Sequence, residues 1–596
     1  MSDHLLLLAL GPVQSFITAA RRSRDLWSGS WLLSEISKAA AKALQDGGAQ
    51  LIFPAPGGDL SPGSEFSVGN KVQAVVEKTD EAAVRALMET AKQAARSRFR
   101  EIAESARKEL KDPGALRDDI WQAQVNDYVE TYAAWACIGE AGYDTAVKLA
   151  SAALAARKAT RDFQPSARSA NETPFFSLPK SSLDGARETV LAKDSPGHTL
   201  RRKLGLSGGE QLDCAGIAKR TGGNIDQFTP YTRLAAHAWI EALPEMDRQA
   251  LIDAYEPLVG AGLATRVAGN GDCFKAFPFD AQLLYRSRLD TALRDADNGE
   301  AEALQALRNV LKGVWHRCGE PCPYGVILLA DGDKMGALLG EVKDREHHIR
   351  ITRALSDFAG SVRGRVKEFS GHAIYAGGDD VLAFVPLQSA YKCANALQKD
   401  FADFLQPVAE ALGATNLPTL SVGLTIGHIM EPLGNLRTLA GQAEKIAKGD
   451  DCPDDKKRNA LGIALRVRSG GITRLRMRWD DAAALGDFAF WQTSYQQGAR
   501  QLPSRLAYDA RQVQQRTAFA LIDDEPENIK PEHGIQHAEF VRLLERTRTE
   551  TGKPLDEEMK TRLQSRNQKI GLAKLADELI VARWLAAHTA RDIGDE

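Results

Sequence analysis

The strongest constraint on the fold is the segment 373–385, in which two apolar runs flank Gly377-Gly378-Asp379-Asp380. Both runs are rich in residues that favour β-strands, so the segment predicts a β-hairpin with carboxylates at its tip. The two glycines permit positive φ and leave room for a ligand close to the backbone. Because adjacent carboxylates on a tight turn repel each other, we expect a cation to neutralise them.

A second acidic pair follows another apolar run. Residues 326–330 predict a buried strand that leads into Asp331-Gly332-Asp333. If this strand neighbours the hairpin, Asp331, Asp379 and Asp380 converge, with Asp333 nearby. A site with only oxygen ligands suits Mg²⁺ or Mn²⁺ carrying nucleotide phosphates. The alternative is a solvated acidic turn followed by a helix N-cap, since aspartate is common in both places.

The residues around these motifs predict one α+β unit. Apolar residues at steps of three and four predict helices, and strict alternation predicts half-buried strands. The helices fall at about 355–369, 389–412 and 436–446, and the strands at 326–330, 373–376, 381–385, 420–426 and 461–467. The order strand, helix, strand, strand, helix, strand is the ferredoxin-like arrangement of polymerase and cyclase palms.

With these residues the chain resembles the palm of GGDEF-type nucleotide cyclases, because Ala447-Lys448 and Arg458-Asn459 follow the acidic motifs. It resembles more closely the large subunit of type III-B CRISPR effector complexes, the Cmr-type cyclic oligoadenylate synthetase. That closer resemblance covers most of the chain and rests on the segments Gly11–Ile17, Arg21–Trp27, Ala218–Arg220 before Phe228–Pro230, and Asp331–Gly336.

The resemblance implies a two-metal nucleotidyl transfer, in which the ribose 3′-hydroxyl of one ATP attacks the α-phosphate of another. It implies catalytic roles for Asp331, Asp379 and Asp380, and Mg²⁺ or Mn²⁺ ligation by these three together with Asp333. The positions implied to contact nucleotide are Gly332, Gly377, Gly378, Ser28, Ser30, Lys448 and Arg458. One departure is that residues 449–457 lengthen the interval between Lys448 and Arg458 relative to GGDEF cyclases.

The resemblance also implies partners, namely CRISPR RNA, target RNA, other Cmr-type subunits and ATP. A net charge of −3 gives no basic surface overall, so contacts with RNA must come from local patches or partner subunits. Seven cysteines without regular pairing indicate a reducing compartment, and no apolar run is long enough for a membrane span. We therefore expect a cytoplasmic protein with no membrane contact.

The N-terminal part repeats the palm pattern without the acidic set. Residues 4–110 predict a strand, a long helix, two strands and a second helix, but the first strand ends in Ala9-Leu10-Gly11 with no carboxylate. We expect a catalytically silent palm over 1–160, in which 115–160 is helical. Its buried stripe comprises Trp121, Val125, Tyr128, Tyr132 and Trp135. Arg21, Arg22 and Arg24 are either a solvated face or a nucleotide or RNA contact.

The remaining boundaries are a loop-rich and helical linker domain over 161–320, the catalytic palm over 321–470, and a helical domain over 471–596. Relatives often carry a zinc module between the palms. Here that interval holds Cys214, Cys273, Cys318 and Cys322, of which only the last two are close in sequence. Structural zinc normally needs two close pairs, so zinc is possible but buried free thiols are favoured.

Three functions stay open on the sequence. The first is a target-RNA-activated synthetase of cyclic oligoadenylates. The second is a stand-alone GGDEF-like dinucleotide cyclase, and the third is an inert structural scaffold of a ribonucleoprotein. Many relatives carry a histidine-aspartate (HD) nuclease domain ahead of the first palm. No His-Asp dipeptide occurs in this chain, so we expect no DNA cleavage.

Overall fold

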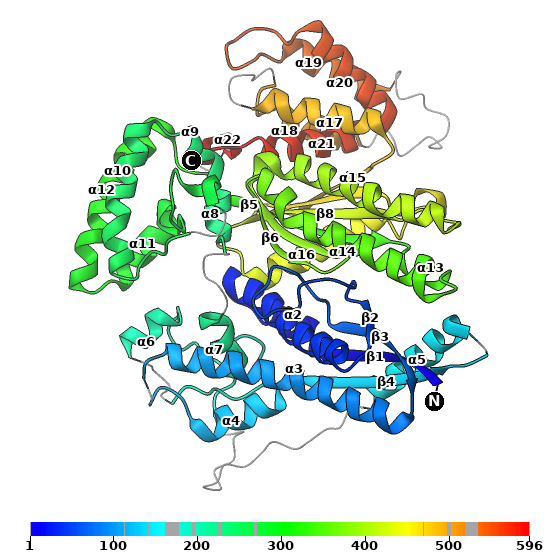
Figure 1. Ribbon diagram of the computed structural model, residues 1–596. Coiled ribbons are helices and arrows are strands. Elements are labelled where there is room, and N and C mark those ends of the chain that lie inside the picture. The colour runs from blue at the N-terminus through cyan, green and yellow to red at the C-terminus, as the bar shows by residue number, and fades with distance from the viewer. Residues whose placement is uncertain are drawn as a thin grey trace.

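The computed structural model describes residues 2–112, 114–140, 142–160, 178–192, 197–222, 228–267, 271–468, 470–496, 502–518 and 534–594. Two α+β units, each built on one sheet, are stacked in the lower and middle parts of Figure 1. One helical unit stands at the left of the second sheet, and the C-terminal helices cover its upper end.

The first unit is a palm built on an antiparallel sheet with the strand order β2-β3-β1-β4. On the central strand β1, Leu6, Leu8 and Leu10 pack with the long helices α2 and α3, whereas the alternate residues Leu5 and Leu7 pack with α5 and the second palm. This alternation confirms the predicted α+β palm. The elements are β1 (Ser2–Gly11), α1 (Gln14–Thr18), α2 (Ser23–Asp46), β2 (Gln50–Phe53), β3 (Lys71–Thr79), α3 (Glu81–Glu109), α4 (Asp118–Asp127), β4 (Glu130–Ile138) and α5 (Gly142–Ala159).

The prediction that 115–160 is entirely helical is wrong. The chain leaves α4 and forms strand β4, which pairs antiparallel with β1 from Asp3↔Ile138 to Gly11↔Glu130. Residues 130–138 are rich in β-branched and aromatic side chains, and the free edge of β1 gives them a pairing partner that local periodicity does not reveal. Of the predicted stripe, Trp121, Val125 and Tyr128 are core residues, whereas Tyr132 and Trp135 lie on the strand.

The second palm has the strand order β10-β9-β8-β5-β7-β6. Its inner part, β8-β5-β7-β6, is the ferredoxin-like order, and β9 extends it in parallel with β8. The strands and helices predicted between 326 and 467 are all present. The elements are β5 (Tyr324–Asp333), α13 (Met335–Gly340), α14 (Arg345–Glu368), β6 (His372–Ala376), β7 (Val381–Val385), α15 (Leu387–Ala411), β8 (Thr419–His428), α16 (Leu433–Lys448), η5 (Asp454–Lys456), β9 (Ala460–Arg466) and β10 (Ile472–Arg478).

Helix α16 lies directly on the sheet because two strand glycines leave no side chain beneath it. A Cβ on Gly423 of β8 would collide with the backbone of Glu444, and one on Gly462 of β9 with the carbonyl oxygen of Ala443. The close approach fixes the last turn of α16 against the strands, and that turn carries Lys448.

Between the palms the chain is mostly helical. The predicted loop-rich stretch from 161 to 230 lies partly outside the described residues, at 161–177, 193–196 and 223–227. Within it, α7 packs into the core of the first palm. Helices α8 to α12 then form a unit with an aromatic core that includes Tyr255, Phe277 and Phe279. The elements are α6 (His198–Lys203), α7 (Cys214–Thr221), α8 (Tyr231–Ala235), α9 (His237–Ala242), α10 (Glu245–Gly260), η3 (Gly271–Phe274), η4 (Gln282–Leu284), α11 (Arg286–Asp295) and α12 (Asn298–Cys318).

The described C-terminal residues are largely helical from residue 482 on, whereas β10 lies inside the range 471–596 predicted as a helical domain and belongs to the second sheet. Apolar residues of these helices join the core of the second palm. Tyr391 of α15, for example, donates a hydrogen bond to the Leu485 carbonyl oxygen at 3.0 Å. The helices are α17 (Ala482–Tyr495), α18 (Leu506–Arg516), α19 (Ile535–Arg546), α20 (Glu557–Ile570), α21 (Leu572–Leu585) and α22 (Ala590–Ile593). Among the helices that the structure describes, none is long and apolar enough to cross a bilayer.

A buried histidine lies where the two palms meet. His348 of α14 has its Nδ1 atom 3.1 Å from the hydroxyl of Tyr143 on α5 and 3.3 Å from the amide nitrogen of Gln73 on β3. Both neighbours can donate, so Nδ1 acts as an acceptor of a neutral ring. Burial, and then the charge of Lys71, lower the pKa of His348 to about 4.

The contact between the palms should therefore weaken in acid. His348 is neutral in the folded protein, but in an unfolded chain it binds a proton below about pH 6.5. The unfolded state then binds more protons, so stability falls as the pH is lowered from about 6.5 towards 4. Thermal unfolding midpoints measured across this range should show a smaller decline in His348→Gln than in the parent. The half-exposed neighbour His347 serves as control. His347→Gln should keep the parental decline, and equal declines in all three proteins would contradict the assignment.

Candidate active site

The acidic motifs meet where β5 ends beside the β6–β7 hairpin. In the antiparallel pairing of β5 with β7, Ala330 lies opposite Val381, so the next residue along β5, Asp331, comes level with Asp380 of the turn. On its other side β5 pairs with β8, which places Asp331 opposite Ser421 and Asp333 opposite Thr419. The sheet register therefore places the two acidic motifs side by side, as expected from the sequence.

The geometry explains why each of these positions is a glycine. Gly378 has a φ of +97°, a left-handed conformation that only glycine adopts without strain. At Gly377 a Cβ would collide with the hydroxyl of Tyr375, and at Gly332 a Cβ would lie 2.7 Å from the Cβ of Asp379. The turn is closed by a 3.0 Å hydrogen bond from the Gly377 N–H to the Asp380 carbonyl oxygen. The glycines thus let the strand end and the hairpin tip approach closely.

Asp380 shares a hydrogen bond with Asp331. Desolvation by the surrounding protein, that hydrogen bond, and the charge of Asp379 together raise the pKa of Asp380 to about 8. Because Asp380 stands exposed at the hairpin tip, its contact with Asp331 is the cause that the geometry supports most directly. Burial also raises the pKa of Asp379, the charge of Asp331 adds to the shift, and Lys448 opposes it. Burial and crowding with Asp331 therefore raise the pKa of both hairpin carboxyls, so the cluster favours the binding of positive charge.

Lys448 supplies a positive charge that partly neutralises the acidic cluster. Its Nζ lies 2.5 Å from Oδ2 of Asp331 and 2.6 Å from Oε1 of Glu444, one turn earlier on α16. Burial alone would lower the pKa of Lys448, but these two ion pairs outweigh it and raise the pKa. The Lys448 ammonium group thus supplies a positive charge at the acidic cluster, a charge that a metal ion could replace.

Asp333 has a different environment from the other three acids. It is fully buried, and its carboxylate accepts hydrogen bonds from the hydroxyls of Ser421 (2.9 Å) and Thr419 (2.8 Å). A third bond comes from the backbone N–H of Asn459 at 3.0 Å, just ahead of β9. The sequence predicts Asp333 as a metal ligand, and this stays a prediction; in the structure both of its oxygens bind β5 to β8 and to the start of β9.

The segment between Lys448 and β9 is anchored from β10. Arg476 donates hydrogen bonds to the carbonyl oxygens of Ala447 (3.2 Å) and Lys456 (2.6 Å). Arg458 has a positive φ, and its N–H donates to the Lys448 carbonyl oxygen at 2.8 Å. Its guanidinium lies 3.6 Å from Asp333, so Arg458 is near the acidic cluster but on the side of Asp333.

In the described part of the chain no three His, Cys, Asp or Glu side chains are grouped closely enough to hold a metal ion as they stand. The predicted zinc-position cysteines are dispersed: Cys214 and Cys322 lie in separate apolar cores, and Cys273 and Cys318 pack against a third. The carboxylates at the hairpin tip remain a prediction as metal ligands.

The first palm has no acidic cluster at the equivalent place. Ala9 and Leu10 at the end of β1 are buried apolar residues. Asp59 falls in the loop between β2 and β3, where it is exposed and accepts a 2.9 Å hydrogen bond from the N–H of Ser61. Ser28 and Ser30 are buried in α2, and the Ser28 hydroxyl has no hydrogen-bond partner among the residues that the structure describes. A nucleotide could reach Ser28 only if its packing neighbours moved.

Several residues at the site were not singled out from the sequence. Glu444 lies one helical turn before Lys448, an i, i+4 spacing that could have revealed the pair. Ser421 and Thr419 occupy alternate positions on β8 and are the partners of Asp333. Tyr375 covers Gly377, and nothing in its local sequence distinguishes it from an ordinary strand residue.

Two family models match this chain, one in each palm. Residues 324–462 match the family described as Cas10/Cmr2, second palm domain, and residues 5–104 match the family described as CRISPR-associated protein Cmr2, N-terminal. The Cmr subunit Cmr2 of the CRISPR system of Pyrococcus furiosus is 29% identical over 238 residues, which is 34% of this chain. The aligned region spans 26% of that relative, about a quarter of its length.

Solved structures share the fold over most of the chain. A chain of the type III-B Cmr-beta complex in its apo state superposes with a TM-score of 0.61 at 11% identity, covering 93% of this chain and 78% of that one. A chain of Cmr-beta bound to cognate target RNA gives a TM-score of 0.54 at 12% identity, covering 96% and 83%. The likeness is one of fold.

Replacement of Asp333 should affect stability more than replacement of Asp380. Asp333→Ala leaves the Ser421 hydroxyl and the Asn459 N–H without their acceptor, at a cost of about 1–3 kcal/mol for each buried group. Asp380→Ala removes an exposed carboxyl that is repelled by the neighbouring carboxylates, so the thermal unfolding midpoint should stay the same or rise slightly. Differential scanning fluorimetry of the two variants provides the comparison. Equal midpoints would show that Asp333 does not tie the strands together.

Proposed function

We propose that this chain, a Cmr2-type protein by both of its palm domains, is the large subunit of a type III-B CRISPR effector complex and makes cyclic oligoadenylates from ATP. The observation that carries the proposal is the contact between Asp331 and Asp380 at the meeting of β5 with the hairpin. The register of β5 with β7 brings these two residues level, and carboxylates placed close to one another form a strong site for cations. An inert scaffold would have no need of that arrangement.

The donor set fits a hard divalent cation. Asp331, Asp379 and Asp380 supply only carboxylate oxygens, the ligands that Mg²⁺ and Mn²⁺ prefer. When bound, such ions would polarise the ATP phosphates and favour ionisation of the attacking 3′-hydroxyl. The residues proposed to hold them are Asp331, Asp379 and Asp380, while Asp333 acts as a positioning residue that fixes the end of β5.

The chain's own residues would orient the substrate. Lys448 is charged and lies at the acidic cluster, so its ammonium group can move from Asp331 to a nucleotide phosphate as the carboxylates gain other cations. Gly378 leaves open space beside the turn, since a Cβ there would meet no atom within 4 Å. Arg458 is held on the Asp333 side of the cluster and is a weaker candidate for a phosphate contact.

The first palm would present the acceptor ATP. Helix α2 packs against the second palm, where Trp27 shares a core with Ile374 of β6. Positioning of that kind can contribute about 7–11 kcal/mol to a reaction between two bound molecules. Ser28 and Ser30 stay candidates for the acceptor contact, on the condition that α2 shifts to admit it. We infer that target RNA, CRISPR RNA and other Cmr-type subunits bind this chain in the cytoplasm, as one solved relative is a Cmr-beta complex bound to cognate target RNA.

The experiment is a product assay with radiolabelled ATP and Mg²⁺ on the assembled complex, with and without target RNA. Asp379→Ala/Asp380→Ala should reduce labelled oligoadenylate at least about 100-fold, because charge neutralisation by the metal site is worth several kcal/mol. Binding of target RNA should be unchanged. Asp59→Ala is the matched control: it alters the acid of the first palm's hairpin loop and should leave the rate within about twofold of wild type.

The alternatives predict different results. A stand-alone cyclase would form a cyclic dinucleotide without RNA, and an inert scaffold would form no product under any condition. If Asp59→Ala were as damaging as the double substitution, the first palm would be a second catalytic centre.

A further inference from the structure

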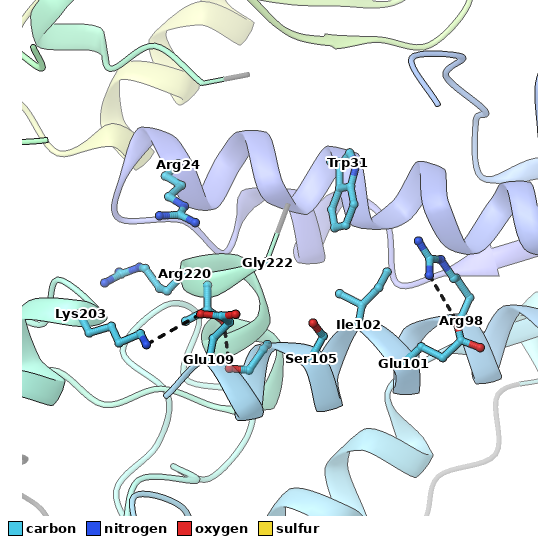
Figure 2. Close-up of a pocket in the computed structure, with 12 residues that line it drawn as sticks. Arg24, Trp31, Arg98, Glu101, Ile102, Ser105, Glu109, Lys203, Arg220 and Gly222 are labelled. Atoms are coloured by element: carbon cyan, nitrogen blue, oxygen red, sulfur yellow. Dashed lines mark hydrogen bonds and ion pairs between the residues drawn. The ribbon is translucent and has the colours of Figure 1, made fainter. Parts of the chain in front are cut away.

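A cavity lies in the first palm, away from the acidic cluster. It has a volume of about 640 Å³, within the range of about 300–1,000 Å³ usual for small-molecule sites. Its walls are formed by α2, α3 and the end of α7, and Lys203 of α6 stands at its edge (Figure 2). Arg24, from the arginine-rich segment at the start of α2, and Arg220, from the segment 218–220, both line this cavity.

The charges around the cavity are nearly all paired. Arg98 is paired with Glu35 and Glu101, and Lys203 lies 3.9 Å from Glu109. Arg220 is fully engaged by Asp25 and by Glu210 at 2.8 Å. These pairs close the cavity walls and leave little net charge on them.

Arg24 is the exception among the lining cations. Its guanidinium has no ion pair or hydrogen bond with the described residues, and its Nε atom is buried without a partner. Burial lowers the pKa of Arg24, Asp25 partly opposes the shift and Arg220 adds to it. A cation without a partner in a confined space is costly, so this position favours an anionic group from outside the chain.

An aromatic wall faces the same cavity. Trp31 lies seven residues after Arg24 on α2, which places the two side chains on one face of the helix about 10.5 Å apart along its axis. Figure 2 shows both pointing from α2 towards α3, where Ile102 lies below the indole. Indole faces stack with nucleobases, and a single arginine suits a single phosphate.

We propose that this cavity binds one nucleoside monophosphate unit, with its base against Trp31 and its phosphate on Arg24. The unit is either a free nucleotide or one residue of a single-stranded RNA, since both present the same chemistry. The inference is independent of the proposed catalysis, because no metal site or ATP turnover enters it.

The test uses the full chain in EDTA, which suppresses metal-dependent binding of nucleotides. Titration calorimetry is carried out with adenosine 5′-monophosphate, adenosine, inorganic phosphate and a six-residue oligoadenylate RNA. The monophosphate or the RNA should bind, and adenosine should bind at least about tenfold more weakly than the monophosphate, since it lacks the charge-assisted bond to Arg24. Tighter binding of the RNA than of the monophosphate identifies an RNA residue as the ligand, and the reverse identifies a free nucleotide.

Three variants test whether the measured binding takes place in this cavity. Arg24→Gln should weaken binding about tenfold or more, and Ser105→Trp, which fills the cavity from an exposed position on α3, should abolish it. Arg21→Gln alters an exposed arginine of the same segment that does not line the cavity and should leave the affinity within about twofold. Because Ser105 is exposed, that variant should keep the parental unfolding midpoint, which separates loss of binding from loss of folding.

Binding that is insensitive to both Arg24→Gln and Ser105→Trp would overturn the proposal. So would inorganic phosphate binding as tightly as the monophosphate, because Trp31 would then contribute nothing. Absence of binding by both the monophosphate and the RNA would overturn it as well.

Discussion

The second palm depends on one buried carboxylate. Asp333 ends β5, and by accepting hydrogen bonds from Ser421, Thr419 and the N–H of Asn459 it fixes β8 and the start of β9 to that strand. A buried carboxylate is costly unless such donors surround it, and here they do. The position of Asp331, two residues earlier on the same strand, follows from this anchoring. The close approach of α16, which Gly423 and Gly462 allow, brings Lys448 to the cluster.

The local environment distinguishes Asp333 from the other three aspartates, although all four look equivalent in the sequence. Asp331, Asp379 and Asp380 crowd together at the strand end and hairpin tip, where mutual repulsion raises the affinity for protons and cations. Asp333 differs in facing hydroxyls, a backbone N–H and, at 3.6 Å, the guanidinium of Arg458, which together offset its buried charge. Lys448 neutralises part of the negative charge of this cluster, and divalent ions would neutralise more of it.

Much of this could be predicted from the sequence because the relevant signals are local. Alternation and helical periodicity define each strand and helix of the second palm, and Gly-Gly-Asp-Asp between two apolar runs defines the hairpin. The helix predicted over 130–138 is wrong because a tertiary partner decides: these residues form a strand since β1 offers an edge. The hydrogen-bond partners of Asp333, Ser421 and Thr419, likewise lie on another strand, β8. Neither partner is near in sequence, so no local pattern could reveal them. The cavity below α2 likewise depends on contacts among segments far apart in the chain.

The most direct test of this account is a structure of the complex with Mn²⁺ and a non-hydrolysable ATP analogue, in which anomalous scattering locates the metal. The account predicts Mn²⁺ at about 2.0–2.4 Å from oxygens of Asp331 and of Asp379 or Asp380, with Lys448 displaced towards the phosphates and Asp333 still bonded to Ser421. Metal ligated by Asp333, or an intact Lys448–Asp331 ion pair with no metal at the hairpin tip, would contradict it.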